Sequence, residues 1–144
     1  MMIVPFEAAH LRLMMVQPAQ VQTLGFVKES DLEMIEKKTQ AFTAIADDEI
    51  LACAGVIEYY PGRGEGWSYL SANIKHHMVP VVRAIKTYIQ DSNVRRIEIT
   101  VDADFEQGHR MAKLLGLELE APRMRAYDLA GRDRALYARI KEHV

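Results

Sequence analysis

Glu58 is the side chain best suited to acid–base chemistry in this sequence. It stands near the end of an otherwise apolar run, residues 50–60, and a carboxylate with apolar neighbours is a candidate general base. The competing interpretation is that Glu58 faces solvent, because alternate residues of an antiparallel strand often do. The residue types alone leave both interpretations open.

A basic cluster, Lys75-His76-His77, follows the middle of the chain. Its side chains could contact phosphate, remain solvated in a loop, or bind a metal ion. A metal site is disfavoured, because adjacent histidines point in different directions and no carboxylate or cysteine lies nearby in the sequence. We therefore expect no bound metal.

Other polar and aromatic residues have both a functional and a structural interpretation. Asp102 and Asp104 could attract a cationic ligand at the carboxyl end of a strand, or could cap the next helix. Tyr127 could line a binding pocket or pack across a hairpin, as Tyr137 is expected to do. Trp67 is expected to anchor the core.

Composition limits the classes of partner. The chain has 144 residues, 49% of them hydrophobic and 26% charged, which fits a single domain over residues 1–144. The net charge of -2 gives no electrostatic reason to expect nucleic acid or membrane binding. The single cysteine, Cys53, excludes an internal disulfide and is either a small buried hydrophobe or a nucleophile. A homodimer is possible.

The N-terminal residues do not resemble a signal peptide, because they lack a basic region and a sustained apolar core. The longest apolar stretches are also shorter than the roughly 20 residues that a membrane span needs. We therefore expect a cytoplasmic protein.

Hydrophobic periodicity predicts the elements that would position these residues. A short strand over residues 2–6 precedes two helices, over residues 8–14 and about 30–40, the second with Ser30 and Glu33 as a capping box. A hairpin of residues 41–46 and 50–60 leads to a strand over residues 67–71. The rest comprises helix 78–91, strand 96–102, helix 105–115 ended by Gly116, and strands 117–119, 124–129 and 135–140.

This order, β-α-α-β-β-β-α-β-α-β-β, resembles the GCN5-related N-acetyltransferase (GNAT) fold over nearly the whole chain. Residues 101–105 and 108–118 resemble the strand, helix and terminal glycine of the GNAT core. Residues 51–58 with Trp67, and residues 125–129, 131–133 and 136–139, are similar to GNAT-like proteins of tailed phages and prophages. The resemblance implies an α/β fold with a GNAT-like mixed central sheet and helices on both faces.

The resemblance also implies a site for acetyl-CoA as cosubstrate. In the family, the pantetheine arm bonds to the open edge of the fourth strand, and the phosphates lie at the start of the following helix. On this sequence the corresponding residues are Leu70, Ser71, Lys75, His76, His77 and Met78. Glu58 is then the expected general base for an amine acceptor.

Three features depart from the family pattern. Residues 73–78 contain no glycine, whereas the family has a Gly-rich phosphate loop. Ala112 and Phe105 stand where the family usually has its tyrosine acid and an asparagine. The resemblance implies an acyl-CoA-dependent N-acetyltransferase with an unidentified amine or protein partner, whereas these departures favour an alternative. The alternative is a catalytically inactive GNAT-fold phage structural, accessory or interaction protein.

Overall fold

The computed structural model describes residues 1–142, apart from the side chains of Gln22, Thr23 and Lys38. Its residues group into two compact units. The first unit comprises Met1–Ile57 with Trp67–Val81, and the second comprises Glu58–Gly66 with Val82–Val144.

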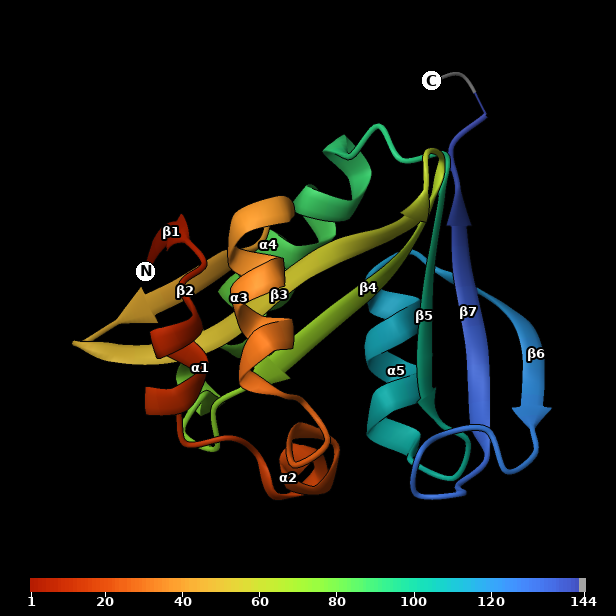
Figure 1. Ribbon diagram of the computed structural model, residues 1–144, viewed down its shortest axis with the longest axis horizontal. Coiled ribbons are helices and arrows are strands. Elements are labelled where there is room, and N and C mark those ends of the chain that lie inside the picture. The colour runs from red at the N-terminus through yellow and green to blue at the C-terminus, as the bar shows by residue number, and fades with distance from the viewer. Residues whose placement is uncertain (143–144) are drawn as a thin grey trace. The chain divides into compact units, whose positions relative to one another are not determined.

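The strands form a mixed seven-stranded sheet in the order β1-β2-β3-β4-β5-β7-β6, which confirms the predicted α/β fold class (Figure 1). The strands are β1 Met2–Pro5, β2 Phe42–Ala46, β3 Glu49–Tyr60, β4 Arg63–Leu70, β5 Arg96–Asp102, β6 Glu118–Met124 and β7 Arg134–Ile140. The helices are α1 Ala8–Leu13, α2 Pro18–Leu24, α3 Glu29–Lys38, α4 Met78–Asp91 and α5 Glu106–Leu114, with a 3₁₀ helix, η1, at Lys75–His77.

The segment between β1 and β2 holds one helix more than the sequence predicts, namely α2. Pro18 is its first residue, a position where the missing N–H of proline removes no helical hydrogen bond. The predicted capping box of Ser30 and Glu33 is wrong. Instead the Lys28 N–H donates to Asp31 Oδ2 at 3.0 Å, so the helix is capped two residues earlier.

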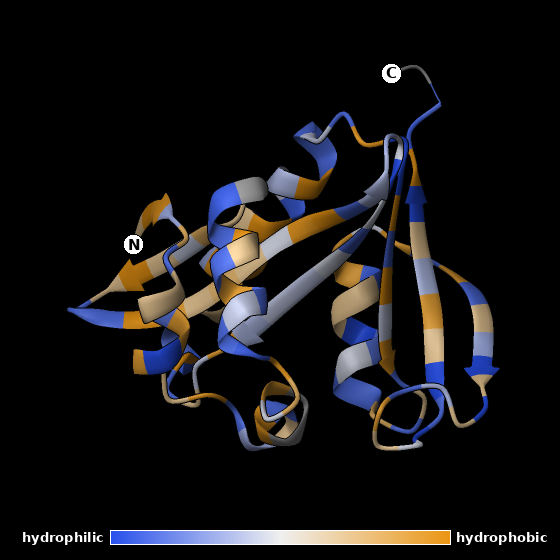
Figure 2. Ribbon diagram, viewed as in Figure 1, coloured by the Kyte–Doolittle hydropathy of each residue, from blue (hydrophilic) through white to orange (hydrophobic). Residues whose placement is uncertain are grey.

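The antiparallel strands β1, β2 and β3 organise the first unit. The predicted hairpin of β2 and β3 is confirmed, and its turn residues Asp47 and Asp48 have φ of 53° and 60°. That left-handed conformation suits a two-residue hairpin turn. Residues 51–56 of β3 are all buried, and Figure 2 shows this stretch as hydrophobic between polar strand ends. A strand covered on both faces has such a continuous apolar run.

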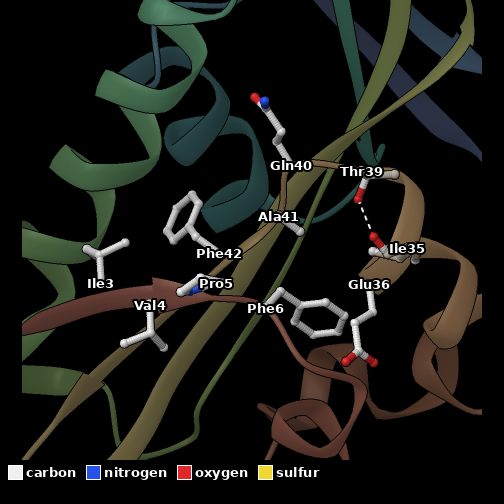
Figure 3. Close-up of a pocket in the computed structure, with 10 residues that line it drawn as sticks. All are labelled: Ile3, Val4, Pro5, Phe6, Ile35, Glu36, Thr39, Gln40, Ala41 and Phe42. Atoms are coloured by element: carbon white, nitrogen blue, oxygen red, sulfur yellow. Dashed lines mark hydrogen bonds between the residues drawn. The ribbon is translucent and has the colours of Figure 1, made fainter.

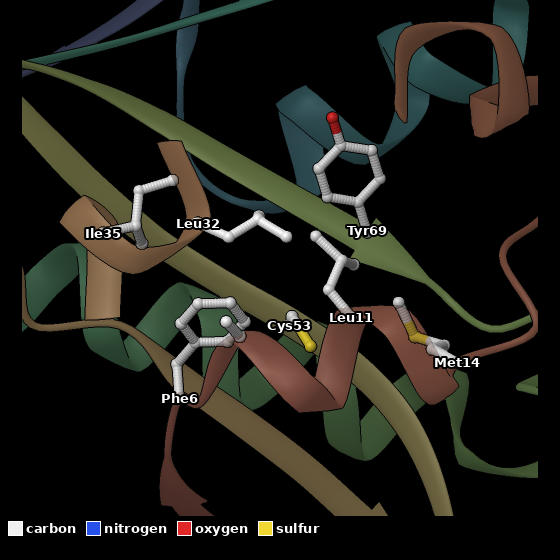
Figure 4. Packing of buried hydrophobic residues seen from close by; sticks show 8 residues of the cluster. Phe6, Leu11, Met14, Leu32, Ile35, Cys53 and Tyr69 are labelled. Carbon is white, nitrogen blue, oxygen red and sulfur yellow. The ribbon is translucent and has the colours of Figure 1, made fainter. Parts of the chain in front are cut away.

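Helices α1 and α3 cover β3 and β4 in the first unit with one hydrophobic cluster (Figure 4). Leu11 of α1 and Leu32 of α3 point toward Cys53 and Tyr69 in this view. Cys53 is fully buried and Thr43 Oγ1 lies 3.6 Å from its sulfur. Burial raises the pKa of this thiol to about 11. These facts support the interpretation of Cys53 as a buried hydrophobe.

The second unit is built on β5, which pairs along its full length with β7. The antiparallel register runs from Arg96↔Ile140 to Asp102↔Arg134. β6 pairs with the other edge of β7 and ends at Met124. The predicted strand over residues 124–129 is therefore wrong, because the chain turns at Ala126, whose φ is 48°.

The two long helices and β5 direct part of their apolar residues into the core. Ile85, Ile89, Ile97 and Leu115 are buried, whereas Val82, Ile99 and Met111 are half-buried. Val81 and Ala112 are also fully buried, and they lie on the same helix faces as Ile85 and Leu115.

β4 begins at Arg63, four residues before the predicted start at Trp67. It pairs with β5 in the parallel sense over residues 63–65, from Arg63↔Arg96 to Glu65↔Glu98. The Glu98 carboxylate accepts two hydrogen bonds from Arg63, at 2.7 and 3.1 Å, and one from Arg96 at 2.6 Å. This ion cluster joins the two strands where their ladder is formed.

Candidate functional site

The hydrogen bonds of β4 define which of its edges is turned away from β3. The N–H of Ser71, directly after β4, donates to the carbonyl of Leu51 in β3 at 2.8 Å. Successive residues of a strand direct their backbone groups to opposite edges. Ser68 and Leu70 therefore present theirs at the other edge, which we name the outer edge of β4.

The side chain of Gln20 in α2 bonds to the outer edge. Its Nε2 donates to the Ser68 carbonyl at 2.8 Å, and its Oε1 accepts from the Leu70 N–H at 2.8 Å. Leu70 and Ser71 are both buried. Of the predicted cosubstrate-binding residues, Leu70 directs its N–H to the outer edge, whereas the N–H of Ser71 bonds to β3.

The main chain before α2 bonds to the same edge. The Gln17 N–H donates to the Leu70 carbonyl at 2.9 Å, and the Ala72 N–H donates to the Met15 carbonyl at 2.7 Å. These two bonds form an antiparallel bridge at the end of β4. The outer edge is thus paired within the first unit from Ser68 to Ala72.

The chain after β4 makes a tight turn before η1 and α4. Ser71 Oγ accepts the N–H of Asn73 at 3.0 Å, and the Ser71 carbonyl accepts the N–H of Ile74 at 3.3 Å. Ile74 is buried, which fixes the turn to the core. The hydroxyl and carbonyl of Ser71 thus stabilise a turn that contains no glycine.

The basic cluster after this turn is divided between two environments. His77 Nε2 lies 3.3 Å from Asp47 Oδ2 in the β2–β3 turn, so His77 is directed toward a carboxylate. Lys75 and His76 are exposed. These two side chains are the members of the cluster that could meet a phosphate.

Met78 begins α4 and continues the helical conformation of η1. Pro80 lies in the first turn of α4. A helix start attracts anions through its free N–H groups and its dipole, but proline contributes no N–H. Anion binding here would depend on the remaining amides near Met78 together with Lys75 and His76.

Glu58, the predicted general base, belongs to the second unit. Its side chain is exposed, and Oε1 accepts the N–H of Gly62 at 3.3 Å across the β3–β4 turn. A carboxylate in this position is open to water and to a soluble amine. This exposure agrees with the interpretation in which Glu58 faces solvent.

Asp102 and Asp104 do not supply the side-chain cap of α5, which begins after Phe105 without one. Asp104 pairs with Arg123, and Asp102 lies 3.5 Å from a nitrogen of Arg132. Both carboxylates therefore balance arginines, Arg123 of β6 and Arg132 of the connection between β6 and β7. These ion pairs describe the two residues better than either predicted role, the helix cap or the site for a cationic ligand.

Tyr127 and Tyr137 differ sharply in exposure. Tyr127 is exposed, whereas Tyr137 is buried and its hydroxyl lies 2.6 Å from His109 Nδ1. His109 Nε2 is 2.8 Å from the Ala103 carbonyl, so Nε2 carries the proton and Nδ1 accepts from Tyr137. The cross-strand packing predicted for Tyr137 thus includes a hydrogen bond to α5.

Trp67 packs against the core of the first unit, as predicted. Its ring meets Phe6 edge-on at a centroid distance of 5.4 Å and lies 6.3 Å from Tyr69. Gln20 and His109 are the residues that sequence reasoning missed. Their partners are 48 and 28 residues away in the sequence, and no local pattern indicates such pairs.

A hollow of about 450 Å³ opens in the first unit between β1, β2 and the end of α3 (Figure 3). It is lined by Ile3, Val4, Pro5, Phe6, Ile35, Glu36, Thr39, Gln40, Ala41 and Phe42. None of the predicted site residues lines it. The Glu36 carboxylate accepts the Ala8 N–H at 3.2 Å, so the one acidic group of this hollow already holds the start of α1.

Within residues 1–142, no three histidine, cysteine, aspartate or glutamate side chains are grouped so that they could hold a metal ion. No helix among these residues has both the length and the apolar character that crossing a membrane requires.

No protein-family model and no curated protein matches the chain. Solved structures do match. Ribosomal-protein-alanine N-acetyltransferase from Brucella melitensis has a TM-score of 0.74 at 13% identity, over 98% of this chain and 100% of that one. A GNAT-family acetyltransferase from Streptococcus pneumoniae has a TM-score of 0.72 at 13% identity, over 98% and 99%.

A putative phosphinothricin N-acetyltransferase is similar to the same extent, with a TM-score of 0.75 at 10% identity over 99% of both chains. Identities this low show likeness of fold and carry no residue-level assignment. The match nevertheless extends over essentially the whole of each chain. The protein therefore has the fold of the GCN5-related N-acetyltransferases.

Proposed function

We propose that this protein is an N-acetyltransferase that transfers the acetyl group of acetyl-CoA to an amine. The observation that supports this most is the match of fold over 98% of this chain and 100% of an N-acetyltransferase. A fold alone does not fix chemistry. The proposal therefore also depends on whether the residues of the β4 edge and the α4 start suit the cosubstrate.

The outer edge of β4 has the right chemistry for the extended pantetheine arm, which contains two amide groups. The Ser68 carbonyl accepts and the Leu70 N–H donates, and the Gln20 carboxamide bonded to both shows that an amide fits there. Lys75 and His76 would hold the phosphates together with amides near Met78. This pair of basic side chains would take the place of the absent glycine loop.

In the proposed reaction the neutral amine attacks the thioester carbonyl carbon. A C–N bond forms, the C–S bond breaks, and the sulfur leaves with its electron pair and takes up a proton. The proton lost by the amine passes to Glu58 or to water. The Leu70 N–H, once released from Gln20, would polarise the carbonyl oxygen, as an oxyanion donor does.

The test is CoA binding to the intact protein, measured as a thermal shift. At a CoA concentration about 100 times the dissociation constant, the stabilisation is about 2.7 kcal/mol. Replacing Lys75 and His76 together by Glu should remove this shift, because two carboxylates repel the pyrophosphate. The matched control is Lys37→Glu with Gln107→Glu, two exposed sites where the same change in formal charge should leave the shift intact.

A second candidate function is binding without catalysis, as in a GNAT-fold accessory or structural protein, including one encoded by a phage. Two observations favour it: the outer edge of β4 is already paired internally, and residues 73–78 lack glycine. This candidate predicts no thermal shift at millimolar CoA. Such a result would eliminate the acetyltransferase proposal.

A further inference from the structure

The Gln20 carboxamide imitates one residue of a neighbouring strand. In a parallel ladder, a single residue donates its N–H to one residue of the partner strand and accepts from the residue two positions further on. Gln20 does the same with its side chain, donating to Ser68 and accepting from Leu70, both at 2.8 Å. The carboxamide therefore fills a strand position opposite Tyr69.

The segment that carries Gln20 is short and is attached to the outer edge through few bonds. α2 has 7 residues, and a helix of this length is marginal without tertiary contacts. Its attachment consists of the Gln20 side chain, the bridge that Met15 and Gln17 form with β4, and the half-buried Val16 and Leu24, which pack against the core cluster. Val21 in the middle of α2 is exposed. In contrast, Met14 directly before the segment is buried in the core (Figure 4).

We propose that residues 15–24 form a gate, in which Gln20 and the Met15–Gln17 main chain occupy the outer edge of β4 in the free protein and are displaced by the pantetheine arm of CoA. This inference rests on the proposed function, because it names the regulation of that same site. The anchored Met14 and the buried Leu70 define the fixed parts, and α2 is the part that moves.

The physical reason is competition for the same two backbone groups. The Leu70 N–H can donate fully to Gln20 or to an amide oxygen of the ligand, but not to both. The free protein must therefore lose the Gln20 bonds before the arm binds. The apparent dissociation constant for CoA is the intrinsic one divided by the fraction of molecules in which the gate is open, so a mostly closed gate weakens binding.

The decisive variant is Gln20→Ala, which removes both bonds and keeps the helix. Calorimetric titration with CoA should show about tenfold tighter binding than to the original protein, equivalent to about 1.4 kcal/mol. Gln107→Ala is the control, since Gln107 is an exposed helical glutamine in the second unit, and its affinity should be unchanged. If Gln20→Ala does not fold, Gln20→Met removes the same bonds at nearly constant volume.

Hydrogen exchange tests the movement independently of affinity. In the free protein the N–H groups of Gln17 and Gly25 donate to the carbonyls of Leu70 and Val21. When CoA binds, these two N–H groups should exchange faster. The Leu70 N–H should stay protected, because the ligand replaces Gln20. Unchanged exchange at Gln17 and Gly25 in the CoA complex would overturn the gate.

The possible outcomes separate the gate from the proposed function. Tighter binding of CoA by Gln20→Ala than by the original protein supports the gate. Equal or weaker binding by Gln20→Ala, while the original protein binds CoA, overturns the gate and leaves the acetyltransferase proposal intact. If neither protein binds millimolar CoA, both proposals fall.

Discussion

Glu98 provides the sharpest test of how the β4–β5 junction is held together. It is 8% exposed, yet it carries a carboxylate that accepts three hydrogen bonds from two arginines. Replacing it by glutamine keeps the shape and removes the charge. Only one oxygen then remains to accept, and the new NH₂ group faces guanidinium donors.

The expected cost follows from the number and exposure of these bonds. A hydrogen bond to a charged group contributes about 1.5–3 kcal/mol. Removing one partner of a fully buried ion pair costs about 3–5 kcal/mol. The side chains of Arg63 and Arg96 are 41% and 27% exposed, so water can partly replace the lost acceptor. We therefore expect Glu98→Gln to lower the free energy of unfolding by about 2–3 kcal/mol at neutral pH.

The loss should depend on pH in a defined direction. The hydrogen bonds from Arg63, and secondarily those from Arg96, lower the pKa of Glu98 from its ordinary value of 4.5. Between the folded and the ordinary pKa, the unfolded chain binds more protons, so stability rises with pH. The contribution of Glu98 is thus complete above pH 4.5 and disappears as pH falls through the folded pKa.

Urea unfolding of both proteins from about pH 7 to about pH 3 measures this difference. Glu33→Gln is the control, because Glu33 is exposed and surface changes usually alter stability by less than about 0.5 kcal/mol. A loss below about 0.5 kcal/mol for Glu98→Gln, or a loss that stays constant down to the lowest pH, would refute the reasoning.

Two further predictions concern buried groups. Tyr137→Phe should cost about 1–3 kcal/mol in the free energy of urea unfolding, because it leaves His109 Nδ1 without its donor, whereas Tyr127→Phe at an exposed site should cost almost nothing. Cys53, with a pKa of about 11 and no exposure, should react with a thiol reagent at about pH 8 at least about a thousandfold more slowly than after unfolding in urea, and rapid reaction in native buffer would contradict its burial.

The sequence predicts correctly those helices and strands whose structure depends on residues close together in the chain. Hydrophobic periodicity predicts the helix over residues 78–91 and the strand over residues 96–102, and the structure has α4 and β5 over the same residues. Gly116 ends α5 with φ of 86°, the left-handed conformation that glycine adopts without strain. In each case the residues that indicate the element lie within the element or directly beside it in the sequence.

The errors occur where tertiary contacts override local preference. The sequence predicts that the strand begins at residue 67, but Gly64 and Gly66 also lie within β4. A Cβ on Gly66 would be 3.0 Å from Ile99 Cγ2, so this strand uses glycine where β5 comes close. The sequence predicts two short strands over residues 117–119 and 124–129, where the structure has the one strand β6. β6 contains Pro122, which an edge strand with an irregular register tolerates.

The cosubstrate residues proposed at the end of β4 stay a prediction, and the side chain that bonds to this edge is one that the sequence does not indicate. Leu70 and Ser71 follow from the position of β4, because any strand end offers N–H and C=O groups. Gln20 lies in a segment of weak periodicity, and its partner Ser68 is 48 residues away. Only the folded structure shows that these two residues meet.

The two halves of β4 pair with different kinds of partner. Residues 63–65 pair with another strand, and the carboxylate of Glu98 adds three bonds at that ladder. Residues 68–70 pair with one carboxamide from a short helix and with the main chain before it. A strand ladder separates only if many bonds break together, whereas a single side chain can exchange with a ligand of the same chemistry. The outer edge of β4 is therefore the part of this sheet where a ligand that carries an amide can compete with the protein itself.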